Sequence, residues 1–217
     1  MDAEIKFCGL TRREDANHAA ALGAAYVGVI FASGPRLLTP DRARDVLHDV
    51  PSPVKRVGVF AAQSDDDIAR AVDMARLDVV QLHSEWNPQR ITRLRERVGR
   101  DVWPVVRVEG PTLPDWITDA FALGDAMLID ALVPGSLGGT GVALPWAQLS
   151  AKLQTARAGA RLVLAGGLKP ENVAIAIAAL SPDVVDVSSG VESAPGIKDH
   201  DRMRAFRDAV SHASIPT

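Results

Sequence analysis

Ile5-Lys6-Phe7-Cys8-Gly9-Leu10-Thr11 is a short, largely apolar run that ends in the only cysteine of the chain and turns at once into a helix start. Thr11 and Glu14 have the spacing of a capping box, a pattern that opens many helices. The stretch therefore predicts one strand followed closely by one helix. The same unit returns along the chain, and its repetition decides the fold.

Runs rich in valine and isoleucine alternate with longer helical patterns eight times. The predicted strands are 5–8, 26–31, 55–59, 79–83, 103–108, 126–130, 161–164 and 184–188. Strands that are apolar almost throughout, each followed by a helix, are typical of a parallel sheet covered on both faces. Eight such units in 217 residues predict one α/β domain over 1–217, a closed (β/α)8 TIM barrel.

An open doubly wound sheet is the alternative arrangement of these elements. A dinucleotide-binding sheet of that kind needs a GxGxxG turn in its first unit, and this chain has none there. Its glycine-rich turns instead follow the sixth and seventh strands. The closed barrel is therefore the preferred prediction.

Alternation within the strands predicts polar side chains inside the barrel. In the first strand Lys6 and Cys8 share one side, and Ile5 and Phe7 share the other. Because a lysine is unfavourable beneath an apolar helix layer, Lys6 and Cys8 are expected to face the interior. An unpaired buried charge is very costly, so Lys6 is predicted to pair there with Asp186 of the eighth strand.

Composition limits the partners and the compartment. Lys and Arg number 24 against 27 Asp and Glu, so the net charge is −3 and no basic field favours nucleic acid. The longest apolar run, 24–32, is far shorter than the roughly 20 residues that span a bilayer. Residues 1–4 carry acids where a signal peptide needs a basic flank, and a lone cysteine suits a reducing compartment. We expect a cytoplasmic protein without nucleic-acid or membrane partners.

Two titratable side chains end strands where a barrel holds its catalytic groups. Cys8 precedes a helix N-terminus, which together with nearby cations can lower the pKa of a thiol and make it a carbon-acid base. Asp130 follows four apolar residues, and desolvation there can keep its carboxyl protonated as a proton donor. The alternatives are a buried apolar cysteine and an aspartate that only caps a loop. A thiolate and a carboxylic acid on one rim suit an isomerisation without a cofactor.

Turns after the last two strands predict a phosphate site. Gly166 and Gly167 follow the seventh strand, and Ser188, Ser189 and Gly190 end or follow the eighth. Barrels commonly hold phosphate at this place with loop N–H groups. The alternative is that both are only tight turns.

Two further side chains are candidates for substrate contacts. Arg36, in the loop after the second strand, has a planar guanidinium that matches a carboxylate, although most exposed arginines are only solvated. His83 ends the fourth strand and either orients a substrate or is a satisfied core histidine. No cluster of histidine, cysteine and acidic residues has metal-ligand spacing, so no metal site is predicted.

Short motifs follow one another along nearly the whole chain. They are Lys6-Phe7-Cys8-Gly9-Leu10-Thr11, Ser33-Gly34-Pro35-Arg36, Val80-Gln81-Leu82-His83, Leu128-Ile129-Asp130, Gly138-Gly139-Thr140-Gly141, Ala165-Gly166-Gly167-Leu168, Pro170-Glu171-Asn172-Val173, Val185-Asp186-Val187-Ser188-Ser189-Gly190-Val191-Glu192 and Pro195-Gly196-Ile197-Lys198-Asp199. In this order and spacing the set resembles the phosphoribosylanthranilate isomerase family of tryptophan biosynthesis. Several motifs at consistent spacing are far more specific than any one of them.

The resemblance implies an aldose–ketose isomerase that performs an Amadori rearrangement without a cofactor. It implies that Asp130 is the general acid that opens the ribose ring of N-(5-phosphoribosyl)anthranilate, and that Cys8 is the general base that removes the C2 proton. The product would be 1-(2-carboxyphenylamino)-1-deoxyribulose 5-phosphate. Arg36, on the anthranilate carboxylate, is a predicted substrate-binding residue together with His83 and Asp186. The two phosphate loops would hold the phosphate.

Two alternatives are left open. One is a related barrel acting on another phosphorylated aminoaldose, such as the bifunctional isomerase of histidine and tryptophan synthesis. Those enzymes use two aspartates, and Cys8 in the base position argues against this reading. The other is a non-catalytic phosphate-ligand-binding barrel or a thiol sensor, neither of which needs an acid at Asp130. The expected partner is a small phosphorylated molecule, and the chain is expected to work as a monomer or a homodimer.

Overall fold

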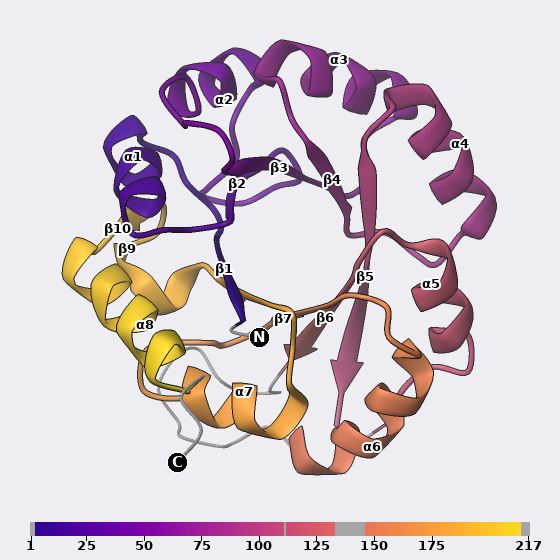
Figure 1. Ribbon diagram of the computed structural model, residues 1–217. Helices are drawn as coiled ribbons and strands as arrows, with labels where there is room; N and C mark the ends of the chain where they lie inside the picture. Colours follow the sequence, from indigo (N-terminus) through magenta and orange to yellow (C-terminus); the bar gives the residue numbers. More distant parts are fainter. Residues whose placement is uncertain (1–2, 111, 133–145, 214–217) are drawn as a thin grey trace.

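The computed structural model describes residues 3–110, 112–132 and 146–213. Within these ranges, parallel strands close into a barrel in the order of the sequence, and Figure 1 shows them as an inner ring surrounded by helices. The strands are β1 (Glu4–Phe7), β2 (Tyr26–Ile30), β3 (Lys55–Phe60), β4 (Val79–Leu82), β5 (Asp101–Glu109), β6 (Met127–Leu132), β7 (Leu162–Ala165) and β8 (Val184–Val187). The helices are α1 (Arg13–Ala21), α2 (Pro40–Val46), α3 (Asp65–Ala75), α4 (Pro88–Val98), α5 (Ile117–Leu123), α6 (Trp146–Arg157), α7 (Val173–Leu180) and α8 (His200–Ala213). The predicted closed (β/α)8 barrel is confirmed.

The ring closes between the first and the last strand of the barrel. Lys6 of β1 is aligned with Tyr26 of β2 on one side and with Asp186 of β8 on the other. Because β1 is paired along both edges, its strand edges are not left open to another chain. The open doubly wound sheet is therefore wrong.

The apolar core has two parts, one inside the barrel and one between the barrel and the helices. Inside, the rings of Tyr26 and Trp103 meet edge to face, with centroids 4.9 Å apart. Outside, Phe7 packs against Phe206 of α8 with a centroid distance of 6.1 Å. Lys6 is aligned with the inward-facing Tyr26, whereas Phe7, the next residue of β1, faces the helices. Successive residues of β1 thus point to opposite layers, as the alternation predicts.

The loop after β8 contains structure that the sequence did not predict. A short 3-10 helix, η1 (Ser189–Val191), leads into a hairpin of β9 (Glu192–Ala194) and β10 (Ile197–Lys198). The hairpin lies beside α1 (Figure 1), and the Lys198 backbone N–H donates to Asp15 of that helix over 3.2 Å. The hairpin therefore ties the end of the barrel to its beginning.

Helix starts agree with the sequence at several places and differ at α1. Thr39, Ser64 and Asn87 each accept a hydrogen bond from the backbone N–H three residues on, the usual N-cap contact. Thr11, by contrast, donates its hydroxyl to the Gly196 carbonyl in the hairpin, and α1 begins without a side-chain cap. The capping box predicted at Thr11 is therefore wrong, because a tertiary contact takes its hydroxyl.

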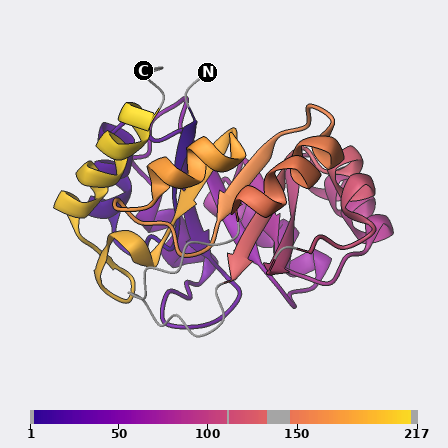
Figure 2. The ribbon, with the colours of Figure 1, turned by 90° about the horizontal axis from the view of Figure 1, so that it is seen from below.

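The two ends of the barrel carry different parts of the chain. Figure 2 shows the start of β1 and the end of α8 at the same end of the barrel, so the carboxyl ends of the strands and the β9–β10 hairpin lie at the other end.

Among the described helices, none is long and apolar enough to cross a membrane. The Gly138–Gly141 motif lies outside the described residues.

Candidate active site

A buried ion pair lies inside the barrel beneath the carboxyl ends of the strands. Lys6 Nζ is 2.8 Å from Asp186 Oδ2, and the two side chains are 0% and 7% exposed. The predicted pairing of Lys6 with Asp186 is confirmed. The second carboxylate oxygen, Asp186 Oδ1, is buried without a hydrogen-bond partner among the described residues. One acceptor inside the barrel is therefore available to a ligand.

Cys8 directly follows β1 and is buried against β2. Its backbone N–H donates to the Val187 carbonyl of β8 over 2.9 Å. A Cβ built on Gly28 of β2 would lie 2.9 Å from Cys8 Sγ and 3.3 Å from Lys6 Nζ. A larger residue at position 28 would displace the Cys8 thiol and crowd the Lys6 ammonium, so the arrangement requires a glycine.

The electrostatics of Cys8 differ from the sequence expectation. Burial raises the pKa of the thiol, the Lys6 ammonium lowers it, and Asp186 raises it again. Lys198 also lowers it, but the net direction is upward. The expected lowering of the thiol pKa is wrong, because desolvation outweighs the two lysines. The resting group is a thiol, with cations beside it that stabilise the thiolate once a proton is lost.

Asp130 lies at the equivalent place on β6. It is aligned with Arg107 of β5 and with Ala165 of β7. Burial raises the pKa of its carboxyl, Arg107 opposes the shift, and the negative charge of Asp186 adds to it. Cys8 directly follows β1 and Asp130 lies toward the end of β6, so both lie toward the carboxyl ends of the strands. Asp186 raises the pKa values of both groups.

His83 follows β4 and is neutral in this environment. Burial, followed by the charges of Lys6 and Arg107, lowers its pKa to about 4. Its Nε2 lies 2.7 Å from Gln81 Nε2. His83 also lines a cavity of about 430 Å³ at the ends of β3 and β4, together with Trp86. A neutral imidazole beside a cavity can donate or accept one hydrogen bond.

The predicted phosphate loops after β7 and β8 lie against each other. A Cβ built on Gly190 would lie 1.9 Å from the Leu168 carbonyl oxygen, so the contact requires a glycine. Gly166 and Gly167 have φ values of 95° and 63°, which favour glycine. Asn172 Nδ2 donates to the Gly167 carbonyl over 3.0 Å and fixes the β7 loop.

Ser188 and Ser189 continue the same surface. The hydroxyl of Ser188 is buried, and within the described ranges it has no hydrogen-bond partner. Ser189 begins η1. The structure thus brings together both predicted phosphate loops beside Cys8, since a Cβ on the adjacent Gly9 would lie 2.7 Å from Ser188 Oγ.

Arg36 is partly exposed, and its guanidinium is held by an ion pair. Its Nε and Nη2 donate to the two carboxylate oxygens of Glu192 over 2.8 and 2.5 Å. Lys198 Nζ donates to Glu192 over 2.9 Å and to the Ser188 carbonyl over 3.0 Å. The sequence alone did not identify Glu192 and Lys198 as site residues, although both belong to motifs that carry the family resemblance. Two charged side chains that closely follow the predicted phosphate loop are the feature of the sequence that indicates a place in the site.

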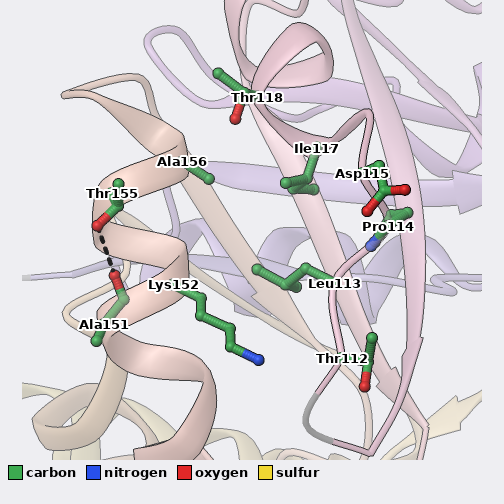
Figure 3. Close-up of a pocket in the computed structure, with 10 residues that line it drawn as sticks. All are labelled: Thr112, Leu113, Pro114, Asp115, Ile117, Thr118, Ala151, Lys152, Thr155 and Ala156. Atoms are coloured by element: carbon green, nitrogen blue, oxygen red, sulfur yellow. Dashed lines mark hydrogen bonds between the residues drawn. The ribbon is translucent and has the colours of Figure 1, made fainter.

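A larger cavity, of about 640 Å³, lies outside the barrel. It is lined by residues of segment 112–118 and by one face of α6, and Lys152 of α6 extends into the space between the helix and this segment (Figure 3). It includes none of the predicted site residues. In the part of the chain that the structure describes, no group of histidine, cysteine and acidic side chains is placed to hold a metal.

A closed parallel barrel whose titratable side chains gather at the carboxyl ends of its strands is typical of the (β/α)8-barrel enzymes. The family model for N-(5'phosphoribosyl)anthranilate (PRA) isomerase matches residues 5–209. The chain belongs to this family, and it is therefore an isomerase of tryptophan biosynthesis. Membership excludes the non-catalytic binding barrel and the thiol sensor.

Individual relatives agree over nearly their whole length. The N-(5'-phosphoribosyl)anthranilate isomerase of Acidithiobacillus ferrooxidans is 42% identical over 203 residues, which are 93% of this chain and 94% of that one. Monomers of the dimeric isomerase from Thermotoga maritima are 32% identical, with a TM-score of 0.83 and coverage of 97% and 99%. An isomerase in complex with reduced 1-(o-carboxyphenylamino)-1-deoxyribulose 5-phosphate is 31% identical, with a TM-score of 0.84 and the same coverage.

Proposed function

We propose that this chain converts N-(5-phosphoribosyl)anthranilate to 1-(2-carboxyphenylamino)-1-deoxyribulose 5-phosphate with Asp130 as general acid and Cys8 as general base. The observation that carries the proposal is the Asp130 carboxyl, whose pKa is raised by burial in the same barrel mouth as Cys8. A carboxyl that stays protonated has a proton to donate. A metal or cofactor is not needed for this chemistry.

The acid step opens the sugar. Asp130 gives its proton to the ribose ring oxygen, the bond from C1 to that oxygen breaks, and the nitrogen lone pair forms a Schiff base. The carboxylate left on Asp130 then faces Arg107, which favours its negative charge. Proton donation of this kind typically contributes about 10²–10⁴-fold in rate.

The base step transfers hydrogen from carbon. In the fraction of molecules whose Cys8 thiol has first lost its proton to solvent, the thiolate takes the proton from C2 and gives an enolamine. The enolamine becomes the ketose by gaining a proton at C1 and losing the proton of its C2 hydroxyl group. Lys6 and Lys198 favour the thiolate, as their effect on the Cys8 pKa indicates. A thiol is a suitable base here, since its pKa is matched to carbon acids more closely than that of a carboxylate.

Binding groups surround the two reacting positions. Arg36 is proposed to hold the anthranilate carboxylate, and the loops at Gly166-Gly167 and Ser188–Gly190 the phosphate. The unpaired Asp186 Oδ1 and the neutral His83 are proposed to bind substrate hydroxyl groups. The complex of a relative with a reduced product analogue supports a phosphorylated small molecule as the ligand.

The test follows the fluorescence of freshly made phosphoribosylanthranilate with wild type, Cys8→Ser and Asp130→Asn. We expect rapid loss of signal with the wild type and a decrease in kcat of about 10²–10⁴-fold in each variant. Full turnover by Asp130→Asn would contradict the assigned acid. An inactive wild type would direct the test to other phosphorylated aminoaldoses.

We also propose the oligomeric state, the compartment and the domain organisation of this chain. A dimeric relative from which monomers were generated supports either a homodimer or a monomer. The net charge of −3 and the lone cysteine support a cytoplasmic protein that does not bind nucleic acid. A single domain over 1–217 is supported by a family match that spans 5–209.

A further inference from the structure

Glu192 occupies an unusual place at the barrel mouth. Its side chain is only 5% exposed, and it lies between the guanidinium of Arg36 and the ammonium of Lys198. Lys198 is itself fully buried and comes from the partner strand of the β9–β10 hairpin. A carboxylate is thus held between two cations beside the proposed active site.

The contact with Arg36 uses one particular edge of the guanidinium. A guanidinium has two edges that can bind a carboxylate with two hydrogen bonds, one formed by Nε and Nη2 and the other by Nη1 and Nη2. Glu192 takes the first, over 2.8 and 2.5 Å. Of the residues that the structure describes, none accepts a hydrogen bond from Nη1. The second edge is therefore available.

The stem of Arg36 is fixed as well. A Cβ on Gly9 would lie 2.6 Å from Arg36 Cδ, so the stem lies directly on the backbone that follows Cys8. Arg36 and Lys198 are also both close enough to Cys8 to interact with it electrostatically. The available edge of the Arg36 guanidinium therefore lies at the same barrel mouth as the Cys8 thiol.

The charges favour one more anion. Arg36, Lys198 and Glu192 together carry a net charge of +1. Buried charges are stable when they are compensated, and a bound carboxylate would bring this group to neutrality. An arginine with no carboxylate on its first edge would instead lose a fixed orientation, because several rotamers of a long side chain become accessible.

We propose that Glu192 is a positioning residue that holds one edge of Arg36 so that the other edge binds the carboxylate on the aromatic ring of the substrate. The inference rests on the proposed role of Arg36. It makes Glu192 a determinant of specificity for carboxylate-bearing substrates, although it touches no substrate atom itself.

The test compares two substrates that differ only in this group, phosphoribosylanthranilate and phosphoribosylaniline. Wild type is compared with Glu192→Gln and Arg36→Met. For Glu192→Gln we expect KM for the anthranilate substrate to rise about tenfold with little change in kcat, since one oriented charge-assisted contact is weakened. KM for phosphoribosylaniline should stay near the wild-type value.

Controls separate positioning from folding. Glu4→Gln removes an exposed ion pair with Arg161 and should leave both substrates unaffected. Glu192→Asp retains the charge on a shorter side chain and should restore part of the lost affinity. An equal effect of Glu192→Gln on both substrates, a fall in KM, or no recovery in Glu192→Asp would overturn the proposal.

Failure of the underlying function gives a different pattern. If Arg36→Met affected both substrates equally, Arg36 would not bind the carboxylate, and the proposed substrate contact itself would be wrong. If Arg36→Met abolished the preference for the anthranilate substrate while Glu192→Gln left it intact, only the positioning role would fail.

Discussion

Lys6 Nζ and Asp186 Oδ2 lie 2.8 Å apart in the interior of the barrel, on residues that are direct neighbours across β1 and β8. The pair holds one positive and one negative charge at defined positions beneath the barrel mouth. Its lysine favours the thiolate of Cys8, and its aspartate raises the pKa values of both Cys8 and Asp130. One ion pair therefore acts on both groups of the proposed acid–base mechanism.

The first prediction concerns the stability of this pair. Lys6→Met should lower the free energy of unfolding by about 3–5 kcal/mol, because it leaves the Asp186 carboxylate buried without a counter-ion. Lys6→Met with Asp186→Leu should recover much of the loss, since no charge then remains. Urea denaturation of both variants, with the exposed Lys55→Met as control, measures this. A loss below about 1 kcal/mol in the single variant would contradict a compensated buried pair.

The second prediction concerns the pKa of the Cys8 thiol. Because the chain has only one cysteine, the thiolate absorbance and the rate of alkylation by iodoacetamide both report Cys8. In the wild type the pKa should lie above the ordinary thiol range, since burial raises it. Asp186→Asn should lower the pKa by removing a nearby negative charge, and Lys6→Met should raise it further. Shifts of both variants in the same direction would contradict the electrostatic cause.

Much of the fold follows from local patterns in the sequence. Apolar runs such as Val184–Val187 and the turns between them predict the strands, and alternation in β1 predicts which side chains face inward. The pairing of Lys6 with Asp186 follows from the cost of burying one charge alone. The ends of strands also predict where Cys8 and Asp130 lie, because parallel strands in a barrel end on one rim.

The parts that sequence did not predict depend on tertiary contacts. Thr11 has the spacing of a helix cap, but the Gly196 carbonyl takes its hydroxyl. Glu192 stands in a segment whose hairpin has no alternation long enough to identify. The direction of the Cys8 pKa depends on how completely the site excludes water, and residue type alone does not report this.

The third prediction concerns the contact of the two phosphate loops. Gly190→Ala should raise KM for the phosphorylated substrate and weaken competitive inhibition by inorganic phosphate, about tenfold or more, because the new methyl group would meet the Leu168 carbonyl. Gly124→Ala is the control. Its Cβ would also be crowded, at 3.0 Å from Pro104 Cδ, but at the other end of the barrel. Unchanged inhibition by phosphate in Gly190→Ala would remove this loop contact from the proposed phosphate site.

The fourth prediction concerns the loss of stability in acid. The pKa of His83 is lowered to about 4 in the folded chain and is about 6.5 when the side chain is exposed. A lowered folded pKa contributes stability that is present above pH 6.5 and is lost as the pH falls toward 4. His83→Gln should therefore lose less stability than the wild type across this window, by at most about 3 kcal/mol. Denaturation curves measured from pH 4 to 8 test this.

The shape of the pH dependence identifies the cause. Above pH 7 the histidine is neutral in both states, so wild type and His83→Gln should differ by a constant amount that reflects packing and hydrogen bonding alone. Below pH 6.5 the difference should shift progressively in favour of the variant, since the wild type must then bury a proton next to Lys6 and Arg107 or unfold. A difference that stays constant from pH 4 to 8 would mean that His83 is accessible to water and can accept a proton in the folded state, which would also weaken its proposed role as a neutral hydrogen-bonding group.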